Sequence, residues 1–110
     1  MQRVMFIDRM RPEDAEKVSA VWEAHDRTGL PRRIGVATRT LYRFRGLYVH
    51  MVEARPDLEG DLADRILSAR TDPLFVETRD RLADYLSPFS PECRTVADTR
   101  AEEFYHWRES

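Results

Sequence analysis

The feature of this sequence that most constrains its fold is a pair of adjoining β-prone segments. Residues 34–44 carry a β-branched or aromatic side chain at every second position, and residues 47–54 have the same character. Arg45-Gly46, between them, is short enough for a tight two-residue turn. The pattern therefore predicts an antiparallel hairpin.

A two-residue turn also fixes the register of this hairpin. Phe44 then faces Leu47, and Leu41 faces His50. Because side chains alternate along a strand, one face carries a defined set of residues. This set comprises Arg39, Leu41, Arg43, Tyr48, His50 and Val52. Arg39 and His50 become diagonal neighbours with Cα atoms roughly 7–8 Å apart, which is close enough for both side chains to grip one ligand.

The segments on either side of the hairpin predict the other elements. Residues 4–10 are β-prone, and Pro12 opens a helix that runs to about His25 or Asp26 and stops near residues 29–31. A second helical stripe covers residues 57–69. Asp72 and Pro73 look like a cap and a first helical residue, and they open a third helix whose inward side chains extend to Leu86.

The chain closes on an aromatic cluster, residues 104–107, which is predicted to form a fourth strand. The resulting order is strand, helix, strand, strand, helix, helix, strand. This order predicts one α+β domain over residues 1–110 with a ferredoxin-like fold, in which a four-stranded antiparallel sheet carries its helices on one face. The other face is then bare, and a second copy of the chain or a ligand is expected to cover it.

The charge and the apolar runs exclude several classes of protein. Eighteen basic against 20 acidic side chains give a net charge of -2, which offers no basic surface to nucleic acid. The longest apolar runs, such as residues 4–7, are far shorter than the ~20 residues that span a bilayer. Arg3 and Asp8 interrupt any secretory signal, so a cytoplasmic protein without a membrane partner is expected.

Metal, nucleotide and thiol chemistry are also disfavoured. The single Cys93 has no internal disulfide partner and no recognisable base, so it is expected to be inert. Three scattered histidines and four glycines match neither a metal motif nor a phosphate-binding loop. The chemistry left open is proton transfer and enolate stabilisation, with no cofactor or metal.

Two places could carry such chemistry. His25 follows Trp22 by three residues and Val18 by seven, which places it on the inward stripe of the first helix, beside Asp26. The helix dipole there favours an imidazolium and hence a general acid, although spacing alone favours the alternative that the pair caps the helix. Arg39 and His50 together resemble an anion clamp beside an acid/base group; each alone could be an ordinary strand residue.

Short motifs over nearly the whole chain match one family in identity and spacing. In chain order they are Arg9-Met10 with Pro12, Ala24-His25-Asp26, Leu30-Pro31, Ile34-Gly35-Val36, Arg39 with Leu41-Tyr42-Arg43-Phe44, Leu47-Tyr48-Val49-His50, Glu53-Ala54, Asp72-Pro73-Leu74-Phe75, Tyr85-Leu86-Ser87-Pro88-Phe89 and Phe104-Tyr105-His106-Trp107. Together they resemble the small polyketide cyclases of the tetracenomycin type, found in actinobacterial clusters for aromatic polyketides and spore pigments.

The resemblance implies a dimeric α+β barrel, a homodimer of ferredoxin-like chains with a deep pocket between sheet and helices. It also implies cofactor-free closure of a further ring of an aromatic polyketide intermediate, by intramolecular aldol condensation and loss of water. The family's proposed catalytic set falls on His25, Asp26, Arg39 and His50. Its roles here would be enolate stabilisation by Arg39, general base catalysis by His50, and general acid catalysis by His25 oriented by Asp26.

Other functions remain open beside this expectation. Family members usually carry more basic residues before the matched arginine, where this chain has Ala37 and Thr38, so the substrate's shape and charge are not fixed by the resemblance. A cofactor-free monooxygenase of the anthrone type shares the fold and size. A dimeric module that binds aromatic polyketides without turnover is a third reading. Transient contact with polyketide synthase components is a further expectation.

Overall fold

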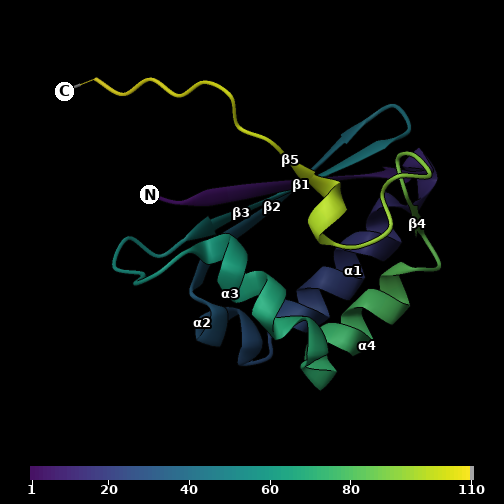
Figure 1. The fold of residues 1–110 in the computed structure, drawn as a ribbon. Coiled ribbons are helices and arrows are strands. Elements are labelled where there is room, and N and C mark those ends of the chain that lie inside the picture. Colours follow the sequence, from purple (N-terminus) through teal and green to yellow (C-terminus); the bar gives the residue numbers. More distant parts are fainter. Residues whose placement is uncertain (110) are drawn as a thin grey trace.

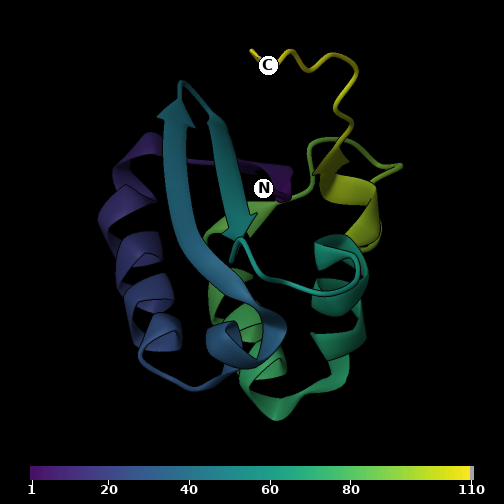
Figure 2. The same cartoon turned by 90° about the vertical axis from the view of Figure 1, so that its left-hand side faces the viewer.

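The predicted hairpin is present in the computed structural model, which describes residues 1–109. Strands β2 (Val36–Phe44) and β3 (Leu47–Ala54) pair antiparallel with Phe44 opposite Leu47 and Leu41 opposite His50. The register is the expected one from Phe44 back to Thr38, where an irregularity shifts the pairing. Figure 2 shows this hairpin facing the viewer, with the helices around and behind it. The face that carries both Arg39 and His50 is therefore the one predicted.

The hairpin joins a larger antiparallel sheet through its β3 edge. Strand β1 (Arg3–Met10) lies next to β3, with Phe6 opposite His50 and Asp8 opposite Tyr48. On its other side β1 pairs with the two-residue strands β4 (Leu86–Ser87) and β5 (Arg100–Ala101). The order β2-β3-β1-β4 and the helices on one face confirm the α+β, ferredoxin-like prediction (Figure 1). Within residues 1–109 the sheet has five strands instead of the predicted four, because β5 also pairs with β1.

The predicted fourth strand at residues 104–107 is wrong. That segment forms no ladder, and Phe104 is 95% exposed, while the chain leads away from the sheet (Figure 1). Aromatic residues favour a strand only where a neighbouring strand and a packed face receive them. The short strands β4 and β5 take the predicted place beside β1, and within residues 1–109 the aromatic cluster pairs with no strand.

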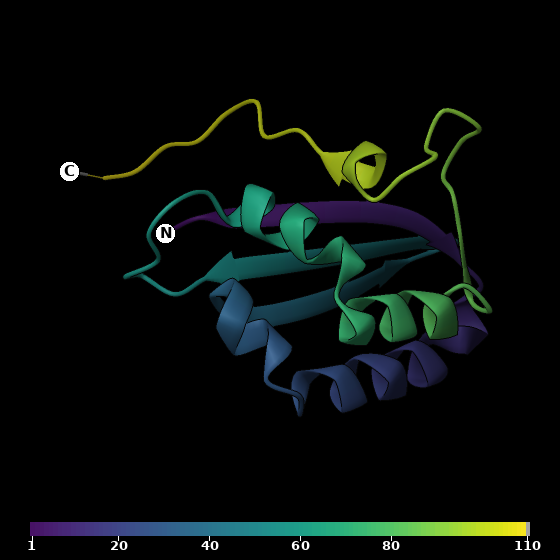
Figure 3. The same cartoon turned by 60° about the horizontal axis from the view of Figure 1, so that its bottom comes forward.

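The helices broadly follow the predicted pattern. A 3-10 turn at Pro12–Asp14 leads into α1 (Ala15–Asp26), and α3 (Leu62–Ser68) is shorter than expected. Helix α4 (Pro73–Leu82) begins as predicted, since the Asp72 side chain accepts a hydrogen bond from the backbone N–H of Leu74. It ends before Leu86, which belongs to β4. Helices α1 and α4 lie side by side beneath the sheet (Figure 3).

One helix was not predicted. Residues 30–34 form α2 (Leu30–Ile34), where the sequence indicated a loop and the start of a strand. Leu30 and Ile34, one turn apart, are both buried in the core beneath β1 and β3. Gly35 ends the helix with a φ of +100°, and the strand begins only at Val36.

The core has two parts. One packs β1 and β3 against α2 and α3; its buried members are Val4, Phe6, Leu30, Ile34, Val52, Ala54, Leu62, Ala63 and Ile66. The other packs α1 and α4 against the opposite end of the sheet; its buried members are Met10, Val18, Val21, Tyr48 and Leu82. Within residues 1–109 no helix has the length and apolar character needed to cross a membrane.

Gly35 is the position where a small substitution should disturb the fold most clearly. Its φ of +100° disfavours any residue with a Cβ, and an added Cβ would collide with Leu58 Cδ1. We expect Gly35→Ala to lower the free energy of unfolding by about 1–3 kcal/mol, measured by urea titration. Gly29→Ala is the control, because its surroundings are open and its φ is negative. Equal effects of the two substitutions would contradict this account.

Candidate active site

A cavity of about 280 Å³ lies between the inner face of the sheet and helices α1 and α4. Its wall is mainly apolar; the apolar members include Phe6, Ile34, Val52, Ile66, Phe75 and Leu82. A few polar side chains project among them, notably Asp8, His25, Arg39, Tyr48, His50 and Thr78. An apolar cavity with a few convergent polar groups is typical of a small-molecule site.

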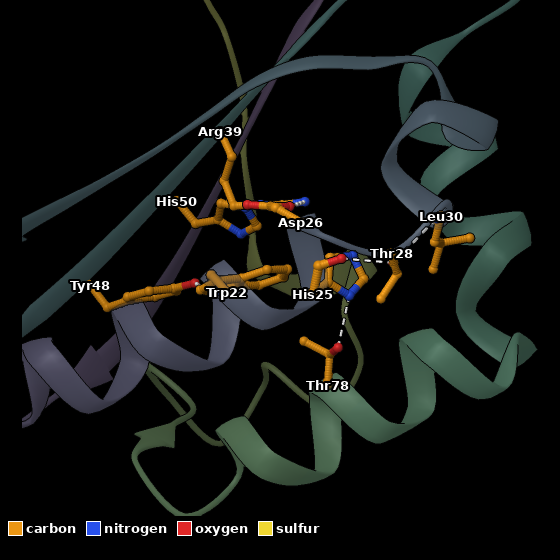
Figure 4. Close-up of polar contacts among 9 residues, drawn as sticks. All are labelled: Trp22, His25, Asp26, Thr28, Leu30, Arg39, Tyr48, His50 and Thr78. Atoms are coloured by element: carbon orange, nitrogen blue, oxygen red, sulfur yellow. Dashed lines mark hydrogen bonds and ion pairs between the residues drawn. The ribbon is translucent and has the colours of Figure 1, made fainter.

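Arg39 of β2 lies beside Asp26 and His50 (Figure 4). Its Nε donates to both carboxylate oxygens of Asp26 at 3.0 and 3.1 Å, and its Nη1 donates to His50 Nε2 at 2.8 Å. Its Cζ lies 4.0 Å from the ring centroid of Trp22. Three neighbours thus fix one guanidinium, whose side chain is only 9% exposed.

His50 of β3 is a neutral imidazole in this arrangement. An arginine can only donate, so His50 Nε2 must accept and its proton must lie on Nδ1. Burial, followed by the positive charge of Arg39, lowers the pKa of His50 to about 3. The side chain therefore holds an accepting lone pair next to a fixed cation.

His25 lies at the C-terminal end of α1 and is buried, as its place on the inward stripe predicts. Its Nδ1 is 2.8 Å from the hydroxyl of Thr78 on α4. Burial, followed by the charge of Arg39, lowers the pKa of His25, with only partial opposition from Asp26. The direction of this shift is opposite to the predicted preference for an imidazolium at this helix end.

Asp26 has a different partner from the one predicted. Its carboxylate binds Arg39, and it borders a shallow groove on the outer side of Arg39 instead of the cavity. Successive helix residues point about 100° apart, so adjacency in sequence does not bring Asp26 to the ring of His25. The structure brings His25, Arg39 and His50 together at the cavity and places Asp26 behind Arg39.

Trp22, Tyr48 and Thr78 complete the site and were not among the predicted site residues. Trp22 Nε1 donates to the Tyr48 hydroxyl at 2.8 Å, and burial raises the pKa of that phenol. The Trp22 ring lies 5.2 Å from the His25 ring and 4.7 Å from the His50 ring, centroid to centroid. The sequence signal for Thr78 was a polar residue on the inward side of α4. For Trp22 the sequence showed only that it belongs to an apolar helical stripe, which does not mark a site residue.

The Thr78 hydroxyl holds His25 in place, and its removal should be measurable. We expect Thr78→Val to lower the free energy of unfolding by about 1–3 kcal/mol, because a buried imidazole nitrogen loses its partner. Urea titration measures this, and nitrogen NMR shifts of His25 report the change at Nδ1. Thr38→Val is the control, since its hydroxyl bonds Glu53 at the exposed surface. An unchanged His25 spectrum in Thr78→Val would contradict the contact.

Other ligand chemistry has little support from the arrangement of side chains. Among residues 1–109, no three His, Cys, Asp or Glu side chains converge as a metal-binding group. Cys93 borders the cavity, and its Sγ lies 3.7 Å from both Ser90 Oγ and the carbonyl oxygen of Asp98. The cluster that can act on a ligand is a fixed guanidinium beside two neutral imidazoles, a combination suited to stabilising an oxyanion and moving protons.

Comparisons with known proteins identify the family of the chain. The family model for the polyketide synthesis cyclase matches residues 2–108. The chain is 42% identical to tetracenomycin F2 cyclase of Streptomyces glaucescens over 105 residues, covering 96% of this chain and 93% of the relative. It is 30% identical to polyketide synthase CurG of Streptomyces cyaneus over 108 residues, covering 97% of each.

The fold agrees as well. A solved structure of the Streptomyces glaucescens tetracenomycin F2 cyclase, described as a type-II polyketide cyclase, superposes with a TM-score of 0.90. It is 40% identical to this chain, and the match covers 100% of both chains. The family match over nearly the whole sequence and the shared fold lead to one conclusion: the chain belongs to the polyketide synthesis cyclase family.

Proposed function

We propose that the protein closes a later ring of an aromatic polyketide by intramolecular aldol condensation followed by loss of water, without a cofactor. The observation that carries this proposal is the Arg39 guanidinium bonded to a neutral His50 at the wall of an apolar cavity. Aldol closure needs an α-proton removed and the resulting enolate oxygen stabilised. The similarity to tetracenomycin F2 cyclase supports an aromatic polyketide as substrate.

Arg39 is the proposed oxyanion-binding group. Its Nε and Nη2 are held by Asp26, which leaves Nη1 as the donor directed toward the cavity side, at His50. When Arg39 Nη1 donates to an enolate oxygen of the substrate instead of to His50 Nε2, this donor lies where negative charge develops. A fixed donor at such a position is commonly worth about 10²–10³ in rate. Asp26 acts as the positioning residue.

His50 is the proposed base. Its Nε2 lone pair, once released by Arg39 Nη1, can accept the proton α to a carbonyl. Its pKa of about 3 reflects burial and the charge of Arg39. An enolate between the two groups offsets that charge, which raises the proton affinity of His50 as the proton arrives.

His25 is the proposed hydrogen-bond donor to the carbonyl under attack. If Nδ1 accepts from the Thr78 hydroxyl, the ring proton lies on Nε2. A neutral imidazole can then polarise a carbonyl oxygen without being protonated. This role replaces the imidazolium acid expected from the sequence, because burial keeps the ring neutral.

We also propose that two copies associate through the outer face of the sheet and work in the cytoplasm with polyketide synthase components. Tyr42 and Phe44 of β2 are 50% and 63% exposed on that face. Exposed aromatic side chains beside a bare sheet favour burial against a second copy. Sedimentation equilibrium tests this, with a mass of twice 13.0 kDa expected and a monomer contradicting it.

The central test uses tetracenomycin F2 as the probe substrate. Incubation with the protein should give a product lighter by one water with one additional ring, identified by mass spectrometry and NMR, and no oxygen should be consumed. Oxygen uptake with a product enriched in oxygen would instead favour an anthrone-type monooxygenase. Binding without any new product would favour a non-catalytic module.

A further inference from the structure

The proposed reaction ends with loss of a hydroxyl group as water, and a departing hydroxyl needs a proton. None of the three cavity groups assigned above is suited to supply it. Burial lowers the pKa of both His25 and His50, so both imidazoles are mainly neutral in the resting site, and His50 is already assigned as the base that takes up the α-proton. Arg39 is too weak an acid. A donor separate from the base would let both proton transfers occur in one step, if the proposed function holds.

Asp8 of β1 is placed to meet that requirement. The inner face of β1 carries Val4, Phe6 and Met10, all buried, and Asp8 is the polar member of this row. It lies directly opposite Tyr48, whereas His50 is opposite Phe6, two residues away on the same face. Diagonal neighbours of this kind have Cα atoms roughly 7–8 Å apart. Asp8 thus shares the cavity floor with the proposed base.

The carboxyl of Asp8 has no structural partner. No hydrogen bond or ion pair to it is found within residues 1–109, and it is the single acidic side chain among those that line the cavity there. The other titratable or charged groups at the cavity are Tyr48 and His50 from β3, His25 from α1, Arg39 from β2, Arg79 from α4, and Cys93 with Arg94 from the following loop. Burial alone raises the pKa of Asp8 to about 6.

A half-buried carboxyl without a partner among residues 1–109 weakens a fold. A polar group removed from water without a hydrogen bond costs free energy, and every other inner position of β1 is apolar. An asparagine of the same shape would carry no ionisation cost at that place. Action on a ligand therefore explains a carboxyl at this position better than stabilisation of the fold does.

We infer that protonated Asp8 is a further catalytic residue, which donates its proton to the hydroxyl of the aldol adduct. In this step the C–O bond breaks and the oxygen leaves as water with the proton of Asp8. The α C–H pair becomes the new C=C bond, and its proton passes to His50 Nε2. A carboxylate and an imidazolium remain, and proton exchange with solvent restores both.

Asp8→Asn tests the inference with tetracenomycin F2 as probe and Asp57→Asn, at an exposed carboxylate, as the control. We expect Asp8→Asn to accumulate the hydroxylated adduct, one water heavier than the product, and to slow dehydration by about 10²–10⁴-fold. In the unsubstituted protein the dehydration rate should fall as pH rises through about 6, and this limb should be missing in Asp8→Asn. Asp57→Asn should change neither.

A stability measurement separates a catalytic role from a structural one. Because the folded pKa is raised, Asp8 should make the free energy of unfolding fall as pH rises from about 4 to about 6. Asp8→Asn should lose this dependence and melt several degrees higher at pH 8. If Asp8→Asn forms the dehydrated product at the normal rate and with the normal pH profile, the role of Asp8 is overturned and the ring-closure proposal is not. No product from the unsubstituted protein would overturn the ring-closure proposal and this role with it.

Discussion

Arg39→Ala is expected to lower the rate of ring closure by about 10²–10³-fold while the chain stays folded. The reason is that the guanidinium borders the cavity and donates a hydrogen bond to His50, where it can stabilise the enolate oxygen. The variant should also raise the pKa of His50, because the charge of Arg39 is one of the causes that lower it. Product formation from tetracenomycin F2 and an NMR titration of His50 measure the two effects.

Two further variants make this result specific. Arg43→Ala removes an arginine from the same strand and face, where its Nη1 donates only to the carbonyl oxygen of Pro12, and it should leave the rate unchanged. Arg39→Lys keeps the charge but cannot bond Asp26 and His50 together through a planar fork, so an intermediate rate is expected. Normal product formation by Arg39→Ala would sink the proposed mechanism.

The hairpin shows why the approach of Arg39 to His50 could be predicted. Side chains alternate with a period of two, and the length of the turn sets the register, so local rules alone place both residues on one face. The same logic identified His25 as inward-facing on its helix. In each case the governing distances lie within one element or between adjacent strands.

Contacts between elements that are distant in the sequence could not be predicted from strand alternation, turn length or helix periodicity. Thr78 meets His25 across two helices, and Asp26 turns to Arg39 on β2, so both pairings depend on how α1 packs beneath the sheet. The aromatic cluster at residues 104–107 failed as a strand because propensity does not say whether a partner edge is free. Asp8 did leave a signal, as the polar member of an otherwise apolar row in β1.

The response of His50 to pH links stability to the proposed chemistry. Its folded pKa of about 3 lies below the ordinary 6.5, so below pH 6.5 the unfolded chain takes up a proton that the folded chain refuses. The free energy of unfolding should therefore fall as pH drops from about 6.5 to about 3, by up to about 1.4 kcal/mol per pH unit from this group. His25 acts in the same direction, and Asp8 in the opposite one.

His50→Gln should separate these effects. Its amide oxygen can still accept from Arg39 Nη1, but the side chain cannot take a proton, so the fall in stability at low pH should become shallower. Ring closure should drop by about 10²–10⁴-fold, because the base is lost while the oxyanion donor remains. His106→Gln, at an exposed histidine near the chain end, should alter neither property. Urea titration across pH and product formation from tetracenomycin F2 measure both. A His50→Gln variant that closes the ring normally would show that the proton is removed by another group, even if its acid stability rises as expected.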